Sequence, residues 1–397
     1  MYCLEKAGQK YRNDPWKRPY PDRIAQLKDA KRYGRKTAAF LYPQFDSSTF
    51  RYRGYNMAET LEYSLWWSGA YFESGELEKL YQELGAIDVL VVIRCAWDSR
   101  LDAFLKAAKA KNIRLCYDVD DLIYHPKYMP SVICALGLSQ EPEWNFWFGL
   151  TQRNYMAAQL CDACITTNGY LAKFLEADFE KPCYVIPNFL NWIQEEVSQS
   201  WYQQKCRMES QKPFEIGYFS GSPTHVKDLM VVMPELESFL NKHENTVLKI
   251  VGCMELPEAY AYLVHSQKIC FVPFQTMEGL QYEQAKTDVN IVPLVNNDFS
   301  NCKSELKYFE SAIVGTVTCA TPNYTYAGAI THGENGYLCR QGEWLPVFEK
   351  LYETGVPKEQ QSVIRKRALA QFSYRNQIKT VQQVLEAVME QITVQSV

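Results

Sequence analysis

The residues most suited to chemistry lie in one segment of the C-terminal half, KSELKYFES at 303–311. At about 100° per residue on a helix, the apolar residues fall on one face, whereas Lys303, Lys307 and Glu310 fall on another. Two lysines four residues apart repel each other unless an anion lies between them. The spacing therefore predicts a clamp for a diphosphate, with Glu310 placed for the hydroxyls of a sugar or ribose. The alternative is a solvated helix face with a Lys307–Glu310 pair.

A second segment, FEIGYFSGSPTHVKD at 214–228, predicts a strand, a tight turn and a helix. The glycine at 221 permits close approach of a ligand, and the free N–H groups of the following helix favour an anion. His225 and Lys227 would add side-chain donors to a diphosphate. An ordinary strand-to-helix loop is the alternative. The spacing differs from GxGxxG, which argues against a nicotinamide dinucleotide.

Polar side chains also follow three predicted strands of the N-terminal half, where open parallel sheets place ligands. The arginines would meet a phosphate or carboxylate of an acceptor, and the carboxylates would take a proton from an acceptor hydroxyl. For the carboxylates, a Mg²⁺ or Mn²⁺ site, a helix cap and a buried ion pair are alternatives. We expect no metal, since the lysine clamp already neutralises a diphosphate. The candidates are Arg51, Arg53 and Asn56, then Arg94, and then Asp118, Asp120 and Asp121.

These segments require rigid elements to position them. Short strands rich in Val, Ile and Leu alternate with helices in both halves, which predicts two parallel sheets covered by helices. We divide the chain into an N-terminal extension (1–35), an N-terminal Rossmann-like acceptor domain (36–190), a polar linker (191–213), a C-terminal Rossmann-like donor domain (214–356) and closing helices (357–397) that cross back to the first domain.

Two local predictions accompany this division. A helix is expected over 54–67, with Trp66 and Trp67 in the core. The aromatic run EPEWNFWFG at 141–149 is expected in a long loop-like insert, as a packed lid or the edge of a core.

Composition excludes several classes. The 397 residues carry 42 Lys and Arg against 46 Asp and Glu, a net charge of −4, which gives no general attraction to nucleic acid. No apolar run approaches the length of about 20 residues that spans a bilayer, and no signal-peptide core is present. The 13 cysteines are scattered along the chain, which is typical of buried thiols in a reducing cytoplasm.

The motifs together resemble retaining nucleotide-sugar glycosyltransferases of the GT-B fold, family 4. The resemblance rests on SGSPTHVKD, on NIVPL followed by KSELKYFESAIVGTVTCATP, on ITHGENGYL, and on ACITTNGYLAKFL followed by YVIPNFLN. It covers residue 35 to the C-terminus. It implies an α/β architecture of two Rossmann-like, doubly wound domains facing across a cleft, with C-terminal helices closing the structure. KSELKYFE and DVDDLIY further resemble a subgroup that builds bacterial surface polysaccharides, including rhamnose-containing ones.

The resemblance assigns Lys227 to the family's diphosphate-binding lysine and Glu310 to the second glutamate of its paired-glutamate motif, which contacts the ribose. Two positions depart from the family pattern, because Ser222 stands where an arginine is expected and Cys302 where the first glutamate is expected. Lys303 is a candidate to supply the missing positive charge. The expected donor-binding set is Gly221, Ser222, His225, Lys227, Lys303, Ser304, Lys307 and Glu310, and the expected catalytic set is Lys227, Lys303 and Lys307 with Asp118, Asp120 and Asp121.

The activity that this resemblance implies is transfer of a hexose from a dTDP-, UDP- or GDP-sugar to a glycan or lipid-linked glycan in polysaccharide biosynthesis, with rhamnosyl transfer as a special case. It needs no cofactor and no metal. We expect a cytoplasmic protein, with peripheral contact at the inner face of the membrane left open. The alternatives are a non-catalytic GT-B module that binds nucleotide or glycan, and a sugar-nucleotide epimerase. A dehydrogenase ranks below both.

Overall fold

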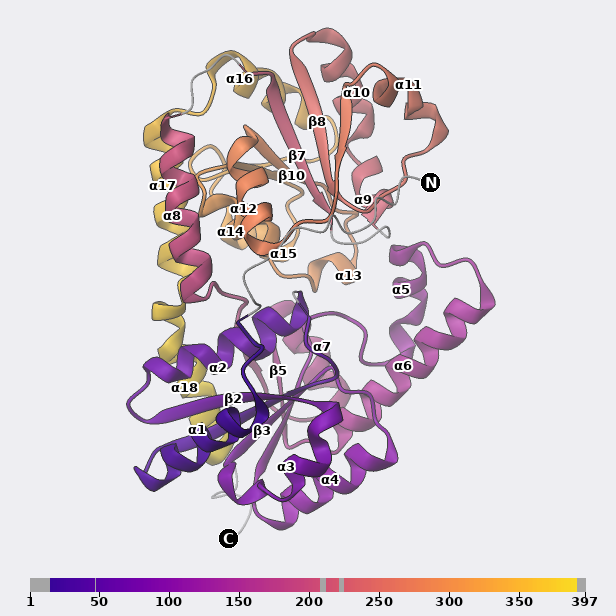
Figure 1. Cartoon of the computed structure of the whole chain (residues 1–397). Helices are drawn as coiled ribbons and strands as arrows, with labels where there is room; N and C mark the ends of the chain where they lie inside the picture. Colours follow the sequence, from indigo (N-terminus) through magenta and orange to yellow (C-terminus); the bar gives the residue numbers. More distant parts are fainter. Residues whose placement is uncertain (1–14, 47, 208–211, 221–224, 391–397) are drawn as a thin grey trace.

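The computed structural model describes residues 15–390 except 47, 208–211 and 221–224. Two six-stranded sheets, in which every pairing is parallel, form its two halves (Figure 1). The strand order is β2-β1-β3-β4-β5-β6 in the first sheet and β12-β11-β10-β7-β8-β9 in the second. The predicted α/β class with two doubly wound sheets is therefore confirmed.

The first sheet is built from residues 36–185. Its strands are β1 (Lys36–Tyr42), β2 (Trp67–Glu73), β3 (Val89–Ile93), β4 (Arg114–Asp118), β5 (Ala163–Thr166) and β6 (Cys183–Val185). Its helices are α1 (Tyr20–Arg32), α2 (Asn56–Thr60), α3 (Leu77–Tyr81), α4 (Ser99–Ala110), α5 (Met129–Leu136), α6 (Glu141–Gln159) and α7 (Gly169–Phe179). Since α1 packs on β1 and β2, part of the segment expected as an extension contributes to this core.

The prediction of one helix over 54–67 is wrong. A π-helical turn at Arg51–Tyr55 leads into the short helix α2, and the chain then enters the edge strand β2. Gly69 permits this arrangement, because a Cβ at that position would lie 2.9 Å from the Ala58 Cα of α2. The helix therefore packs directly on the backbone of the strand.

The second sheet is built from residues 214–338. Its strands are β7 (Phe214–Ser220), β8 (Thr246–Gly252), β9 (Ile269–Val272), β10 (Val289–Val292), β11 (Val317–Ala320) and β12 (Tyr337–Leu338). Its helices are α9 (Val226–Met230), α10 (Met233–Lys242), α11 (Ala261–His265), α12 (Met277–Lys286), α13 (Asp298–Asn301), α14 (Leu306–Ala312), α15 (Tyr324–Ala329) and α16 (Trp344–Thr354).

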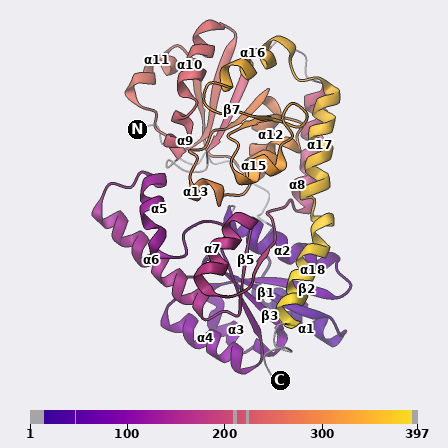
Figure 2. The same ribbon diagram turned by 180° about the vertical axis from the view of Figure 1, so that it is seen from behind.

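Three further helices, α8 (Trp192–Arg207), α17 (Lys358–Phe372) and α18 (Tyr374–Glu390), run along one edge of both halves (Figures 1 and 2). Arg365 of α17 donates hydrogen bonds to Ser198 and Gln199 of α8 at 3.1 and 2.8 Å. Thr60 of α2 donates to the Tyr374 carbonyl at 3.0 Å, and α18 packs on α2. The stretch expected as a linker thus contains a helix that lies beside the C-terminal helices.

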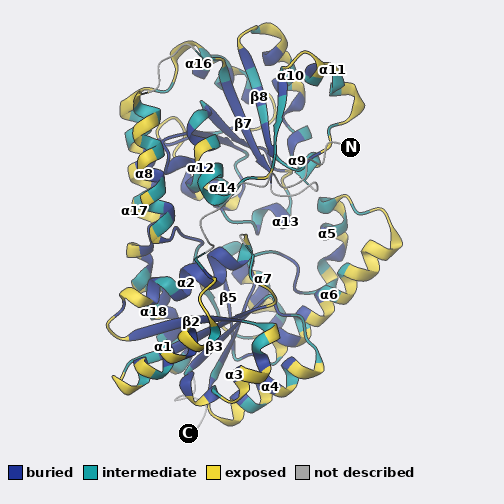
Figure 3. Ribbon diagram, in the orientation of Figure 1, coloured by how far each residue is buried: buried dark blue, intermediate teal, exposed yellow. Residues whose placement is uncertain are grey.

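The exposed aromatic residues differ from the sequence predictions. Trp67 is fully buried as expected, but Trp66 is 71% exposed. The aromatic run at 141–149 forms the start of helix α6, where Trp144, Phe146 and Phe148 are exposed (Figure 3). The run is therefore helical and not a loop, and Trp147 is the aromatic residue of it that packs against the core of the first half. Among the described residues, no helix is long and apolar enough to cross a bilayer.

Candidate functional site

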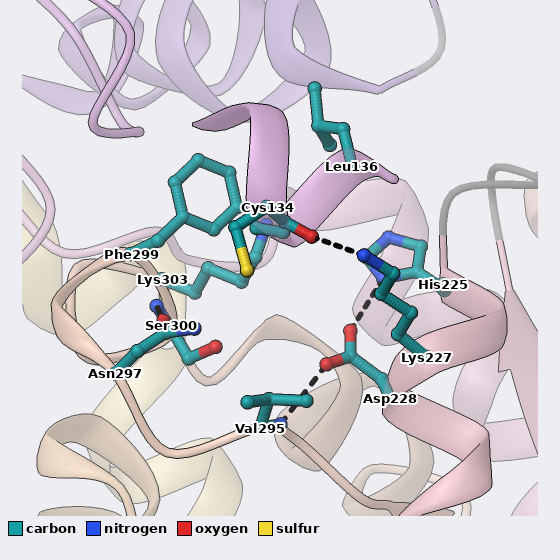
Figure 4. Close-up of a pocket in the computed structure, with 11 residues that line it drawn as sticks. Cys134, Leu136, His225, Lys227, Asp228, Val295, Asn297, Phe299, Ser300 and Lys303 are labelled. Atoms are coloured by element: carbon teal, nitrogen blue, oxygen red, sulfur yellow. Dashed lines mark hydrogen bonds and ion pairs between the residues drawn. The ribbon is translucent and has the colours of Figure 1, made fainter. Parts of the chain in front are cut away.

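The site lies where the carboxyl ends of the two sheets face each other. A small cavity of about 50 Å³ is lined by the end of α5 from the first half and by residues that follow β7 and β10 in the second (Figure 4). Of the predicted residues, His225, Lys227 and Lys303 line it. The predictions at Gly221 and Ser222 fall outside the described residues.

Lys227 reaches across the cleft. Its Nζ donates a hydrogen bond of 2.8 Å to the carbonyl oxygen of Cys134, in the last turn of α5 (Figure 4). The carbonyl end of a helix attracts cations, so the ammonium group of Lys227 is favourably placed there. An anion between the two halves would compete with that carbonyl for the ammonium group.

Lys303 and Lys307 converge on the same region. Lys303 Nζ lies 3.6 Å from Asp121 of the first half and over the ring of Phe299. Burial and the charge of Lys303 lower the pKa of Lys307 to about 8, although Asp228 and Glu310 oppose that shift. A bound anion would stabilise the charged form of a buried lysine whose pKa lies near neutral pH. The predicted diphosphate clamp requires a lysine of this kind.

His225 and Asp228 form a pair between the lysines. The Nδ1 of His225 lies 2.9 Å from Asp228 Oδ2, and Asp228 Oδ1 accepts the Val295 N–H at 3.1 Å. Burial raises the pKa of Asp228, but the hydrogen bonds from His225 and Val295 outweigh it and leave that pKa below its ordinary value. Asp228 was not predicted as a site residue, although its place three residues after His225 is a detectable signal.

Glu310 and Ser304 contact the first half. The Tyr52 hydroxyl donates to Glu310, and burial raises the pKa of that carboxyl to about 7. Asn188 Nδ2 donates to Ser304 Oγ at 2.9 Å. A ribose hydroxyl would therefore have to bond the other carboxyl oxygen of Glu310 or displace the Tyr52 hydroxyl.

Cys302 is fully buried, and its carbonyl accepts a hydrogen bond of 2.8 Å from Asn168 Nδ2. Burial raises the pKa of its thiol, so it carries no charge. The position at which the resemblance expects a first glutamate therefore offers the cleft no carboxylate.

Three of the predicted N-terminal residues do reach the cleft. Arg94 is paired with Asp120 and lies 3.8 Å from Asp121, which also faces Lys303. Arg94 adopts a left-handed φ of 48°, a strained conformation that is frequent at functional sites. Asp121 thus lies between a cation of each half and is the carboxylate best placed to meet an acceptor.

The other N-terminal assignments require correction. Arg53 and Asp118 are completely buried and joined by hydrogen bonds of 3.0 and 2.6 Å, so neither can meet an acceptor or take its proton in this structure. Asn56 is also buried and donates to the Phe189 carbonyl at 2.6 Å. Arg51 is 6% exposed and lies over the Trp16 ring. These four residues hold the first domain together beneath the cleft.

Several residues at the site were not among the predicted site residues. Tyr52, Asn168 and Asn188 are hydrogen-bonded to the segment 302–310 from more than 100 positions away. Among the described residues, no group of three or more His, Cys, Asp or Glu side chains is arranged to hold a metal ion.

Solved structures resemble this chain over most of its length. HepE of Anabaena, solved with UDP-glucose, superposes with a TM-score of 0.56 at 14% identity, covering 88% of this chain and 99% of that one. A glycosyltransferase from Rickettsia africae gives a TM-score of 0.61 at 11% identity, covering 90% and 100%. TarM superposes with a TM-score of 0.53 at 12% identity. The match covers 80% of this chain, which spans 57% of the length of TarM.

At these identities the likeness concerns the fold. The chain has the GT-B fold of these glycosyltransferases, as the resemblance implied. No family model and no curated protein matches the sequence.

Proposed function

We propose that this protein is a glycosyltransferase that moves a sugar from a nucleoside-diphosphate donor to a glycan acceptor. The observation that carries the proposal is the convergence of Lys227, Lys303 and Lys307 where the two sheets face each other. The binding of UDP-glucose by HepE, which shares the fold, supports a UDP-sugar as the first donor to test. A family 4 enzyme of polysaccharide synthesis, transferring rhamnose in the cytoplasm without a metal, is the narrower form of the proposal.

The chemistry follows from where charge develops. As the bond between the anomeric carbon and the diphosphate oxygen stretches, the sugar becomes cationic and the diphosphate gains negative charge. The three lysines stabilise that leaving charge, while closure of the two halves positions the acceptor and excludes water. Asp121, held between Arg94 and Lys303, orients the acceptor hydroxyl.

A second candidate function is a GT-B module that binds nucleotide or glycan without catalysis. The burial of Cys302, where the resemblance expects a carboxylate, favours it. Consumption of nucleotide sugar in the presence of an acceptor separates the two functions, since the module would bind the donor but leave it intact.

Nucleoside diphosphates should raise the melting temperature, because a ligand that binds only the folded state stabilises it by mass action. UDP, GDP, dTDP, ADP and CMP are tested by differential scanning fluorimetry, with NAD as a control. We expect a shift of several degrees with one base, and a much smaller shift in Lys303→Ala. No shift with any nucleotide would contradict the proposal, and a shift with NAD alone would favour a dehydrogenase.

Nucleotide affinity should fall above about pH 8, because the lowered pKa of Lys307 removes one positive charge from the clamp as the pH rises. Lys307→Arg should flatten this part of the profile, since a guanidinium stays protonated. Titration calorimetry with the stabilising nucleotide between pH 7 and 9.5 measures the effect. A wild-type profile that is flat through pH 9 would remove Lys307 from the clamp.

A further inference from the structure

The histidine in the cleft has a fixed orientation of its ring proton. Asp228 receives the Val295 N–H on one oxygen and faces His225 Nδ1 with the other, at 2.9 Å (Figure 4). An ionised carboxylate can only accept hydrogen bonds, so Nδ1 must carry the proton. In the neutral ring, Nε2 is then left with a lone pair.

The surroundings keep this ring neutral. Burial and the charges of Lys307 and Lys303 lower the pKa of His225 to about 4, against the opposing effect of Asp228. At pH 7 the imidazole is therefore an acceptor at Nε2 and not the cationic donor that the sequence suggested for a diphosphate. A lone pair would repel phosphate oxygens, so the group that meets it must carry a hydrogen-bond donor.

We propose that His225 accepts, at Nε2, a hydrogen bond from a hydroxyl of the transferred sugar, and that Asp228 is the positioning residue that holds the ring proton on Nδ1. This inference rests on the proposed function. The cations Lys227 and Lys303 line the same cavity and attract the diphosphate, so the nearest hydroxyl donors are those of the attached sugar and of the ribose. Comparing free with sugar-linked diphosphates separates these two sources. His225 also supplies the site with a hydrogen-bond acceptor for the sugar, which Cys302 cannot provide.

The ligand-free test is direct. With ¹⁵N-labelled histidine, the NMR signals of His225 should show a proton on Nδ1 and a bare Nε2 at pH 7, and only five histidines need to be assigned. Asp228→Asn should move the proton to Nε2, because the amide nitrogen donates to Nδ1 while its oxygen keeps the Val295 bond. A proton on Nε2 in the wild type would overturn the proposal.

The binding test compares UDP, GDP and dTDP with UDP-glucose, GDP-mannose and dTDP-rhamnose by calorimetry on the full chain. His225→Phe keeps an aromatic ring but removes the acceptor. We expect the Kd of the free diphosphate to stay within about twofold and the Kd of its sugar conjugate to rise about tenfold, the usual scale for one hydrogen bond. Asp228→Asn should weaken the conjugate alone as well.

The control is His243→Phe, because His243 also pairs with a carboxylate, Glu349, at 2.8 Å but lies away from the cleft. It should change neither affinity. Equal weakening of free and sugar-linked diphosphate by His225→Phe would place the ring against the nucleotide and not the transferred sugar, and no effect on any conjugate would place it outside the sugar site. Either result overturns the role of His225 while leaving the proposed function intact, whereas failure of every nucleotide to bind the wild type overturns both.

Discussion

Lys303→Ala should reduce the rate of sugar transfer about 100-fold, the scale of losing one preorganised charge at a leaving group. Lys303 lines the cavity at the junction of the two halves. Its segment, 303–311, supplies two of the three converging lysines, Lys303 and Lys307. The melting temperature should change by only a few degrees, because its ion pair with Asp121 is partly exposed and contributes little to stability.

Lys212→Ala is the matched control. Its side chain is about as exposed as that of Lys303, at 26% and 22%, and it also pairs with an aspartate, Asp288. It lies at the opposite end of the second sheet, before β7, so turnover of nucleotide sugar should be unchanged. An unaltered rate in Lys303→Ala, or an equal loss in both variants, would contradict the clamp.

Arg53→Met should lower the free energy of unfolding of the first domain by about 3 to 5 kcal/mol, because it leaves Asp118 without its partner in a site that water does not reach. Arg53 also donates to the Ile186 carbonyl at 2.6 Å and to Asn188 Oδ1 at 3.2 Å, so one side chain ties three segments together. Urea denaturation followed by circular dichroism measures the change. Asp118→Asn, which leaves a smaller defect, gives a second value if the first variant fails to fold.

Arg94→Met is the contrasting variant. Its side chain is 22% exposed at the cleft, so it should impair transfer while costing much less stability. If instead Arg53→Met abolished activity with an unchanged unfolding curve, the buried arginine would have the acceptor role that its geometry denies it.

Local patterns predicted most of the fold. Buried strands such as β3 and β7 are short runs of Val, Ile or aromatic residues followed by helices, which is enough to assign a parallel sheet. The edge strand β2 was not predicted, because its sequence, WSGAYFE, follows a helical stretch without a turn signal. The close packing of Ala58 against Gly69, which lets the helix lie on the strand, is visible only in three dimensions.

The candidate site was predictable where its residues are neighbours in sequence. Lys303, Lys307 and Glu310 lie within eight residues, although Lys303 precedes helix α14 and does not share its face as predicted. His225 and Lys227 are separated by one residue. Contacts between the two halves could not be predicted in this way. One example is the hydrogen bond from Tyr52 to Glu310, two residues that lie 258 positions apart in the sequence.

The sequence also did not show which charged side chains are buried. Two arginines in RYRGY at 51–55 were indistinguishable from ligand-binding residues, because a short pattern does not show that a π-helical turn points Arg53 inward to Asp118. Charge in a short motif predicts chemistry, but three-dimensional packing decides whether that charge faces a ligand or another residue.

The most direct test of the central claim is a crystal structure with the nucleoside diphosphate that gives the largest increase in melting temperature. We expect the diphosphate between the two halves, within hydrogen-bonding distance of Lys227 and Lys303, with the Lys227 contact to the Cys134 carbonyl broken. A diphosphate bound elsewhere, for example in the cavity beside Lys205 and Lys212 on the far side of the second sheet, would contradict it.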